Sequence, residues 1–143
     1  RKLYPMCRKA NFDITVTLVH REEDWVMVNV EPGDTRNHHY GLAVDYGSTT
    51  IIMQLVDLNS GVVIAQEQTV NGQTVFGTDI LTRITYAMED ASHVEDLHRV
   101  TAESIHRLLY ALTENSGIDA SGCPVMVLSG NTTMIHFLLK LWF

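Results

Sequence analysis

Three apolar strand patterns separated by very short turns most constrain the fold of this chain. Residues 41–46 predict a first strand, and the small-residue turn 47–50 leads directly into residues 51–57. This second segment is apolar on nearly both faces, as in a strand at the centre of a sheet. A tight turn at 59–61 precedes a third strand over 62–69. Turns this short join antiparallel neighbours, so the sequence predicts a three-stranded meander.

Two segments with helical periodicity follow the meander, and then a strand and a further helix. The predicted elements are a helix over 80–91, a helix over 94–115, a strand over 125–128 and a helix after residue 132. We expect Thr78 or Asp79 to cap the first helix, and Arg83, four residues after Asp79, to form a surface ion pair with it. Residues 92–95 fit a capping box before the second helix, which Gly117 can end. The element order from the meander onward is β-β-β-α-α-β-α.

The beginning of the chain follows a different pattern. Residues 12–19 alternate between apolar and polar side chains, and residues 25–30 predict a second strand after a polar turn. These two strands form a predicted antiparallel hairpin, and the polar stretch 35–39 is typical of a linker. We therefore predict an α/β chain with two parts, a small β-rich domain within residues 1–36 and a second domain over residues 41–143.

Composition disfavours several classes of function. Ten Lys and Arg residues against 17 Asp and Glu residues give a net charge of −7, whereas a nucleic-acid binder carries a basic surface that neutralises phosphates. No stretch approaches the roughly 20 apolar residues of a membrane helix. Cys7 and Cys123 are too few for a disulfide scaffold or a Cys-rich metal site. We therefore expect a cytoplasmic protein with reduced thiols, no nucleic-acid partner and no membrane partner.

The chain ends in an apolar run without a helix cap or a polar tail. The large apolar residues of this run are Phe137, Leu138, Leu141, Trp142 and Phe143. Natural domains rarely end on exposed aromatic side chains, so we expect a fragment of a longer polypeptide. A contiguous apolar patch of this kind usually marks an interface, and we expect self-association through the exposed C-terminal helix.

The turn after the first meander strand combines one carboxylate, one glycine and three hydroxyls. Gly47 allows a ligand to approach the backbone closely, and successive N–H groups at such a turn can form an anion-binding nest. Ser48, Thr49 and Thr50 add hydroxyl donors for a phosphate. Asp45, at the end of the strand, is the candidate catalytic residue and would hold Mg²⁺ through water. An ordinary β-turn, in which Asp and Gly are common, is the alternative.

A second turn, Gly130-Asn131-Thr132, leads from the fourth strand of the second domain into the last helix. It presents backbone N–H groups at a helix N-terminus, where anions bind. A simple helix cap formed by Asn131 or Thr132 explains the same residues. Neither turn is a Walker loop, because no Lys follows Gly at the required place.

The segment from Asp45 to Thr50, within a three-stranded meander, resembles the first phosphate motif of the superfamily of acetate and sugar kinases, heat-shock chaperones and actin. One branch matches over most of the chain, the reductive activators of corrinoid proteins. The blocks that carry this resemblance are residues 41–45, 71–73, 77–84 and 130–136, with the hairpin that ends at residues 30–34. The resemblance implies an α/β fold in which a small β-rich domain precedes the first half of a ribonuclease-H-like, actin-like ATPase domain.

This resemblance implies an ATP-dependent activator that returns the oxidised corrinoid cofactor of a methyl-transfer protein to its reduced state. The implied site residues are Asp45 for Mg²⁺, then Gly47, Ser48, Thr49 and Thr50 for the β- and γ-phosphates, and Gly130, Asn131 and Thr132 facing the same cleft. The electron would come from a two-iron two-sulfur ferredoxin domain before residue 1. The second phosphate motif and the adenosine-binding loop would follow residue 143. The complete protein would be an ATPase, and the chain alone would be inactive.

The sequence departs from the family pattern at three positions. Tyr46 stands where an aliphatic residue is usual, and we expect it to change only the packing. Ser48 replaces the usual Thr and keeps the hydroxyl. Gly72 stands where Pro is frequent, which leaves the roles of Asn71 and Gln73 open.

Two other classes of function stay open. A small-molecule kinase of the same superfamily would need a substrate pocket with a catalytic base. A non-catalytic interaction module would use the turn after Asp45 only as structure. Four upstream cysteines at plant-type ferredoxin spacing would favour the activator.

Overall fold

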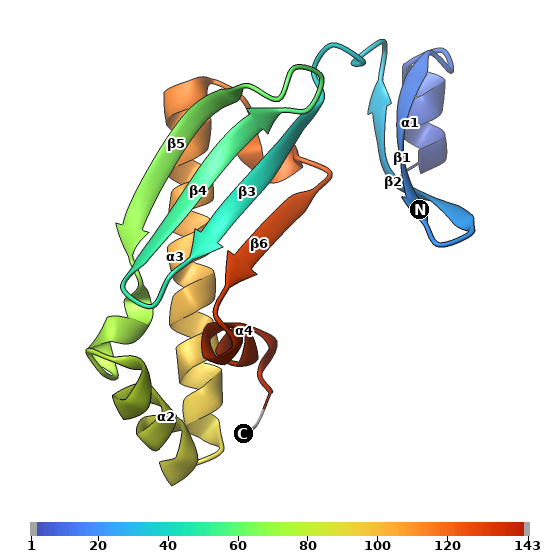
Figure 1. Ribbon diagram of the computed structural model, residues 1–143. Coiled ribbons are helices and arrows are strands. Elements are labelled where there is room, and N and C mark those ends of the chain that lie inside the picture. Colours follow the sequence, from blue (N-terminus) through green and yellow to red (C-terminus); the bar gives the residue numbers. More distant parts are fainter. Residues whose placement is uncertain (1–2, 142–143) are drawn as a thin grey trace.

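A computed structural model describes residues 3–141, which form two separate sheets (Figure 1). The first sheet is an antiparallel pair of β1 (Ile14–Arg21) and β2 (Asp24–Pro32), in agreement with the predicted hairpin. A short helix, α1 (Leu3–Lys9), lies beside this pair. Nothing in the sequence pattern predicts α1, because a helix of seven residues is too short to establish a period.

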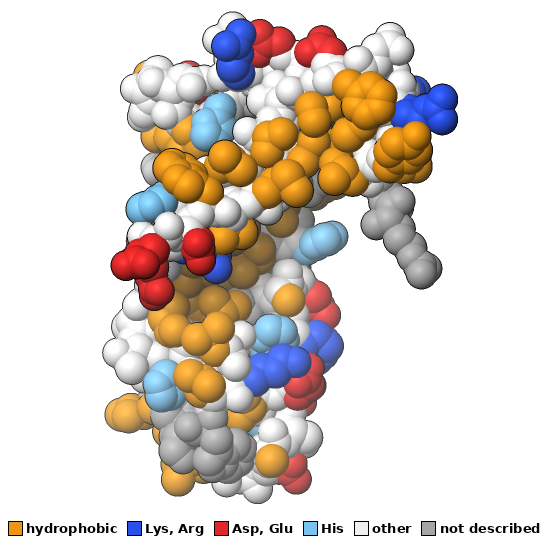
Figure 2. Space-filling model, turned by 90° about the vertical axis from the view of Figure 1, so that its right-hand side faces the viewer, with side chains coloured by type: hydrophobic (Ala, Val, Ile, Leu, Met, Phe, Trp, Pro, Cys, Tyr) orange, Lys and Arg blue, Asp and Glu red, His pale blue; other side chains and the backbone are white. Residues whose placement is uncertain are grey.

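Large apolar side chains lie on the surface of this N-terminal hairpin. Figure 2 shows them gathered across the upper part of the molecule, and Phe12 and Trp25 are more than 60% exposed. A two-stranded sheet is marginally stable on its own, because it cannot bury both of its faces. The N-terminal part of the chain therefore has little core of its own.

The second sheet has four strands in the order β5-β4-β3-β6. The strands β3 (Tyr40–Tyr46), β4 (Thr50–Asp57) and β5 (Val63–Val70) form the predicted antiparallel meander, with β4 in the middle. The last strand, β6 (Met126–Gly130), pairs with the free side of β3 in parallel. Parallel pairing requires a long crossover, which the helices between β5 and β6 supply.

The longest helix, α3 (Ser92–Ser116), runs along one face of the four-stranded sheet and closes the main core (Figure 1). Alternate side chains of β3 and β4 belong to this core, so that Tyr46 and Met53 have no exposed surface. Leu97 and Leu112 of α3 are equally buried. On β3 and β4, the residues that alternate with these buried ones lie on the other face of the sheet. Exposed Asp45, between Val44 and Tyr46, is one of them.

The helix ends show which of the predicted capping residues form caps in the structure. Asp79 caps α2 (Ile80–Glu89), since its carboxylate accepts a hydrogen bond from the backbone N–H of Thr82 at 2.9 Å. Gly117 ends α3 with a left-handed φ of 70°, as predicted. The capping box predicted at 92–95 is wrong, because its first residue already lies in the helix and its hydroxyl donates to a preceding carboxylate.

The last helix, α4 (Thr132–Leu139), is packed more tightly than the sequence suggests. Phe137, expected on an exposed apolar face, is completely buried in the main core. Leu141 is 44% exposed, in agreement with the expectation. Residues 142–143, which belong to the same predicted patch, lie outside the described residues.

The α/β fold class and the order β-β-β-α-α-β-α are confirmed, with two short 3-10 helices at Gly72–Val75 and Ala120–Gly122 added to it. The division into domains at residues 37–40 stays a prediction. No helix within residues 3–141 is both long and apolar enough to cross a membrane. Cys7 and Cys123 are free thiols, as expected.

Candidate functional site

The two turns predicted to bind phosphate begin at the same edge of the sheet. In the parallel pair of β3 and β6, Tyr46 lies opposite Gly130, so the turn after each strand leaves the sheet at the same level. Figure 1 shows α4 starting at the end of the sheet where β3 stops. In open α/β sheets, ligands bind outside the carboxyl ends of the strands, which is where these turns meet.

The hairpin between β3 and β4 has its carbonyl oxygens bound from inside the protein. The side-chain Nδ2 of Asn71 donates to the carbonyl of Gly47 at 2.9 Å, and the backbone N–H of Asn71 donates to the carbonyl of Thr49 at 2.8 Å. The guanidinium Nη1 of Arg83 donates to the carbonyl of Ser48 at 2.7 Å. Three consecutive peptide groups are thus oriented by two side chains and one backbone N–H from other elements.

This orientation leaves the amide groups of the hairpin free. In a trans peptide the N–H points opposite to the C=O of the preceding residue, so carbonyls held inward direct the next N–H groups outward. Within residues 3–141, the backbone N–H groups of Ser48 and Thr49 have no acceptor, and the hydroxyls of Ser48, Thr49 and Thr50 make no hydrogen bond. A Cβ on Gly47 would lie 2.5 Å from the carbonyl oxygen of Thr50, so the hairpin needs glycine there. The result is a set of unpaired donors suited to an anion.

The turn after β6 adds donors of the same kind. Asn131 is the N-cap of α4, and its Oδ1 accepts a hydrogen bond from the N–H of Met134 at 3.0 Å. The helix-cap interpretation therefore accounts for the side chain of Asn131. It does not account for the N–H groups of Thr132 and Thr133, which find no acceptor among the described residues. A Cβ on Gly130 would lie 3.0 Å from the carbonyl oxygen of Tyr46, so glycine also allows the two strands to approach here.

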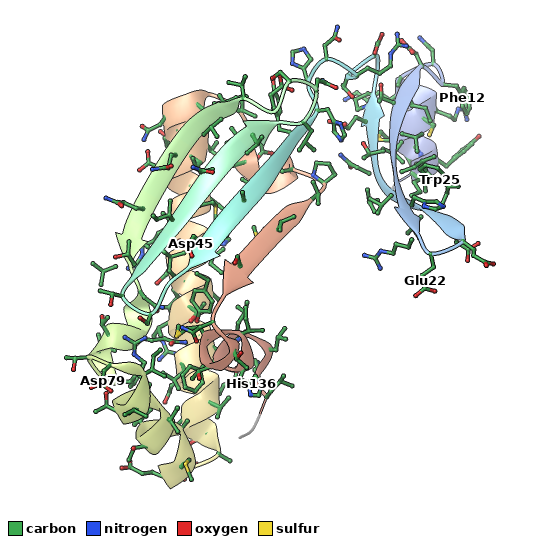
Figure 3. All side chains as sticks on the ribbon, viewed as in Figure 1. Phe12, Glu22, Trp25, Asp45, Asp79 and His136 are labelled. Atoms are coloured by element: carbon green, nitrogen blue, oxygen red, sulfur yellow. The ribbon has the colours of Figure 1, made fainter. Side chains whose placement is uncertain are left out.

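Asp45 lies on the open face of the sheet, beside these turns (Figure 3). Its register partner on β6 is Ser129, and both line an open hollow of about 320 Å³ together with Gln54 and Gln66. The described residues contain no group of three His, Cys, Asp or Glu side chains that could hold a metal ion. Asp45 is thus a single carboxylate, which suits Mg²⁺, an ion that keeps several waters and takes other ligands from phosphates.

The predicted surface ion pair between Asp79 and Arg83 is wrong. Arg83 has no exposed surface, whereas Asp79 uses its carboxylate to cap α2. Besides Ser48, the guanidinium of Arg83 donates through Nε to the carbonyl of Gly77 at 2.8 Å. Burial lowers the pKa of Arg83 from its ordinary value. Helical spacing alone places Arg83 next to Asp79, and only the packing of the turn before α2 directs it inward.

Tyr46 also does more than the sequence suggests. Its hydroxyl is 2.8 Å from Oγ1 of Thr101 on α3 and accepts a hydrogen bond from Nε2 of Gln73 at 2.9 Å. Burial raises the pKa of this tyrosine. The expectation that Tyr46 changes only the packing is therefore wrong. The block 71–73 joins the hairpin to α3, a role that no local pattern in the sequence predicts.

The comparisons with known proteins agree with this architecture. Residues 40–142 match the family model described as "RACo middle region". The corrinoid activation enzyme RamQ of Eubacterium limosum is 31% identical over 102 residues, which are 71% of this chain and 17% of RamQ.

A solved structure of a reductive activator for a corrinoid, iron-sulfur protein superimposes with a TM-score of 0.81 at 31% identity. The alignment covers 99% of this chain and 22% of the activator. The chain thus spans about a fifth of the length of the proteins it matches. The resemblance to reductive activators of corrinoid proteins is confirmed, and the matching region shows that this chain belongs to the RACo middle region family.

Proposed function

We propose that this chain is one part of an ATP-dependent reductive activator of a corrinoid protein, and that it supplies part of the nucleotide phosphate site. The observation that carries the proposal is the set of unpaired backbone donors at the carboxyl edge of β3 and β6. The N–H groups of Ser48 and Thr49 belong to the hairpin, and those of Thr132 and Thr133 belong to α4. Four such donors at one sheet edge match the oxygens of a polyphosphate.

Each site residue has a defined role in this proposal. Gly47, Ser48, Thr49 and Thr50 bind the β- and γ-phosphates through backbone N–H groups and hydroxyls. Gly130, Asn131 and Thr132 form the second turn facing the same phosphates. Asp45 holds the waters of Mg²⁺, and that ion would supply positive charge to the phosphate oxygens. Phosphoryl transfer depends mostly on positioning and charge neutralisation, and both can be provided by such a site.

The relatives support a wider role. Both relatives are named for the activation of corrinoid proteins, in one case of a corrinoid, iron-sulfur protein, and we propose a corrinoid protein as the partner here. ATP hydrolysis would drive electron transfer from a two-iron two-sulfur cluster. This chain has only two cysteines, so that cluster needs ligands from another part of a longer cytoplasmic protein.

The proposal is tested by Asp45→Asn in the complete polypeptide, with ATP hydrolysis as the readout. Asp45 is exposed and makes no hydrogen bond through its side chain within residues 3–141, so the variant should fold like the wild type. We expect the rate of hydrolysis to fall by at least 100-fold, in the range typical of lost charge stabilisation in a transition state. Asp13→Asn, another exposed aspartate, is the matched control and should keep full activity. Unchanged turnover in Asp45→Asn would contradict the proposed Mg²⁺ role.

A further inference from the structure

Arg83 is buried in a way that stability does not explain. Buried arginines are normally paired with carboxylates, yet the hydrogen bonds of Arg83 go to the carbonyls of Gly77 and Ser48 and weakly to the sulfur of Met134, at 3.8 Å. Its Nη2 is buried and has no hydrogen-bond partner among residues 3–141. Replacing such a group by an apolar side chain is often neutral or stabilising, so its presence requires another reason.

The contacts of Arg83 place it where three segments meet. Gly77 precedes α2, Ser48 belongs to the hairpin after β3, and Met134 is in the first turn of α4. The same guanidinium thus binds the hairpin and contacts, through the side chain of Met134, the first turn of α4, in which the other unpaired donors lie.

The contact with Ser48 determines the direction of one particular donor. The carbonyl of Ser48 and the N–H of Thr49 belong to one planar trans peptide group and point in opposite directions. With the carbonyl held by Arg83 at 2.7 Å, the N–H of Thr49 faces away from the core. A charged donor also makes a stronger hydrogen bond than a neutral one and polarises the peptide toward an anion on its far side.

We propose that Arg83 is a positioning residue of the phosphate site, which acts on the bound anion through the Ser48–Thr49 peptide group and does not touch the anion itself. This inference rests on the proposed function, because it assumes that the hairpin binds phosphate. The inference adds to the site a buried residue of α2, which lies on the core side of the hairpin.

The test is a titration of the 143-residue chain with sodium pyrophosphate, followed by the ¹⁵N–¹H NMR signals of the hairpin. In the wild type, the signals of Ser48 and Thr49 should shift at millimolar pyrophosphate. In Arg83→Met, which removes the charge and the donors, the apparent dissociation constant should rise at least fivefold. In Arg83→Lys, which keeps the charge and one ammonium donor, it should rise about twofold.

Two controls separate positioning from general effects. Arg99→Met makes the same change in net charge at an exposed, ion-paired site on α3, and Leu108→Ala destabilises the core away from the hairpin. Both should keep the wild-type dissociation constant within 1.5-fold. A folded Arg83→Met that binds pyrophosphate within twofold of the wild type overturns the inference. If Arg83→Met does not fold, wild-type affinity in Arg83→Lys overturns it.

Failure of the proposed function would be recognised separately. If wild-type signals at both turns do not respond to pyrophosphate, the phosphate site is wrong. Hydrogen exchange then decides the positioning role, because the N–H of Gly47 closes the hairpin by bonding to the carbonyl of Thr50 at 3.1 Å. Its protection should fall at least tenfold in Arg83→Met and about threefold in Arg83→Lys. Unchanged protection in both variants would show that Arg83 does not hold the hairpin. If Arg83→Met does not fold, unchanged protection in Arg83→Lys would show the same.

Discussion

Replacement of Asn71 by alanine should destabilise the four-stranded sheet more than any exposed substitution. Asn71 has no exposed surface, and its side chain makes two hydrogen bonds with backbone groups. Nδ2 donates to the carbonyl of Gly47 at 2.9 Å, and Oδ1 accepts from the N–H of Gln73 at 3.0 Å. Asn71→Ala leaves both backbone groups without a partner.

The magnitude follows from these two lost partners. A buried polar group that loses its hydrogen bond costs roughly 1–3 kcal/mol. Gly47 is half-buried and can recover part of its loss through water, so we expect a total of about 3 kcal/mol for Asn71→Ala. Domains of this size have about 5–15 kcal/mol of stability, so the variant should still fold at 25 °C.

Urea unfolding followed by far-ultraviolet circular dichroism measures this difference directly. Asn115→Ala is the matched control, because Asn115 is exposed on α3 and, within residues 3–141, its side-chain amide bonds only to the carboxylate of half-buried Glu67. That control should change the free energy of unfolding by less than about 0.5 kcal/mol. A loss below about 1 kcal/mol for Asn71→Ala would refute the reasoning, since it would mean that the hairpin carbonyls do not depend on this side chain.

Two further predictions concern the chain by itself. Titration calorimetry should detect no binding of Mg-ATP and no hydrolysis. The chain offers donors only for the phosphates, and the relatives it matches are about five times longer. Complete nucleotide sites with micromolar affinity have a binding free energy of about −8 kcal/mol, and a partial site should bind at millimolar concentration or more weakly. A low-micromolar dissociation constant would show that the nucleotide site is misplaced. Light scattering at high micromolar concentration should show self-association, since Phe12, Trp25 and Leu141 expose apolar surface; a monodisperse monomer would contradict it.

Local signals in the sequence were sufficient for most of the secondary structure. The meander follows from apolar segments separated by very short turns. Asp79 marks one helix end through its side-chain carboxylate, and Gly117 marks another through its left-handed backbone. The short α1 and the absence of a capping box at 92–95 were beyond these signals, because neither involves enough residues to establish a pattern. The candidate turns at Gly47 and Gly130 were also recognisable, since glycine between a strand and small polar residues is itself informative.

Only the tertiary structure decided which side chains hold the hairpin after β3 in place. Asn71 is 24 residues away in the chain from the hairpin carbonyl that its side chain binds, and Arg83 is 35 residues away from its own. Tyr46 and Thr101 are 55 residues apart. Spacing on a helix predicts neighbours three or four residues away, whereas these contacts depend on how α3 packs against the sheet and how α2 packs against α3. A sequence can therefore determine where a phosphate turn begins, but the direction of its N–H groups depends on distant donors that hold its carbonyls.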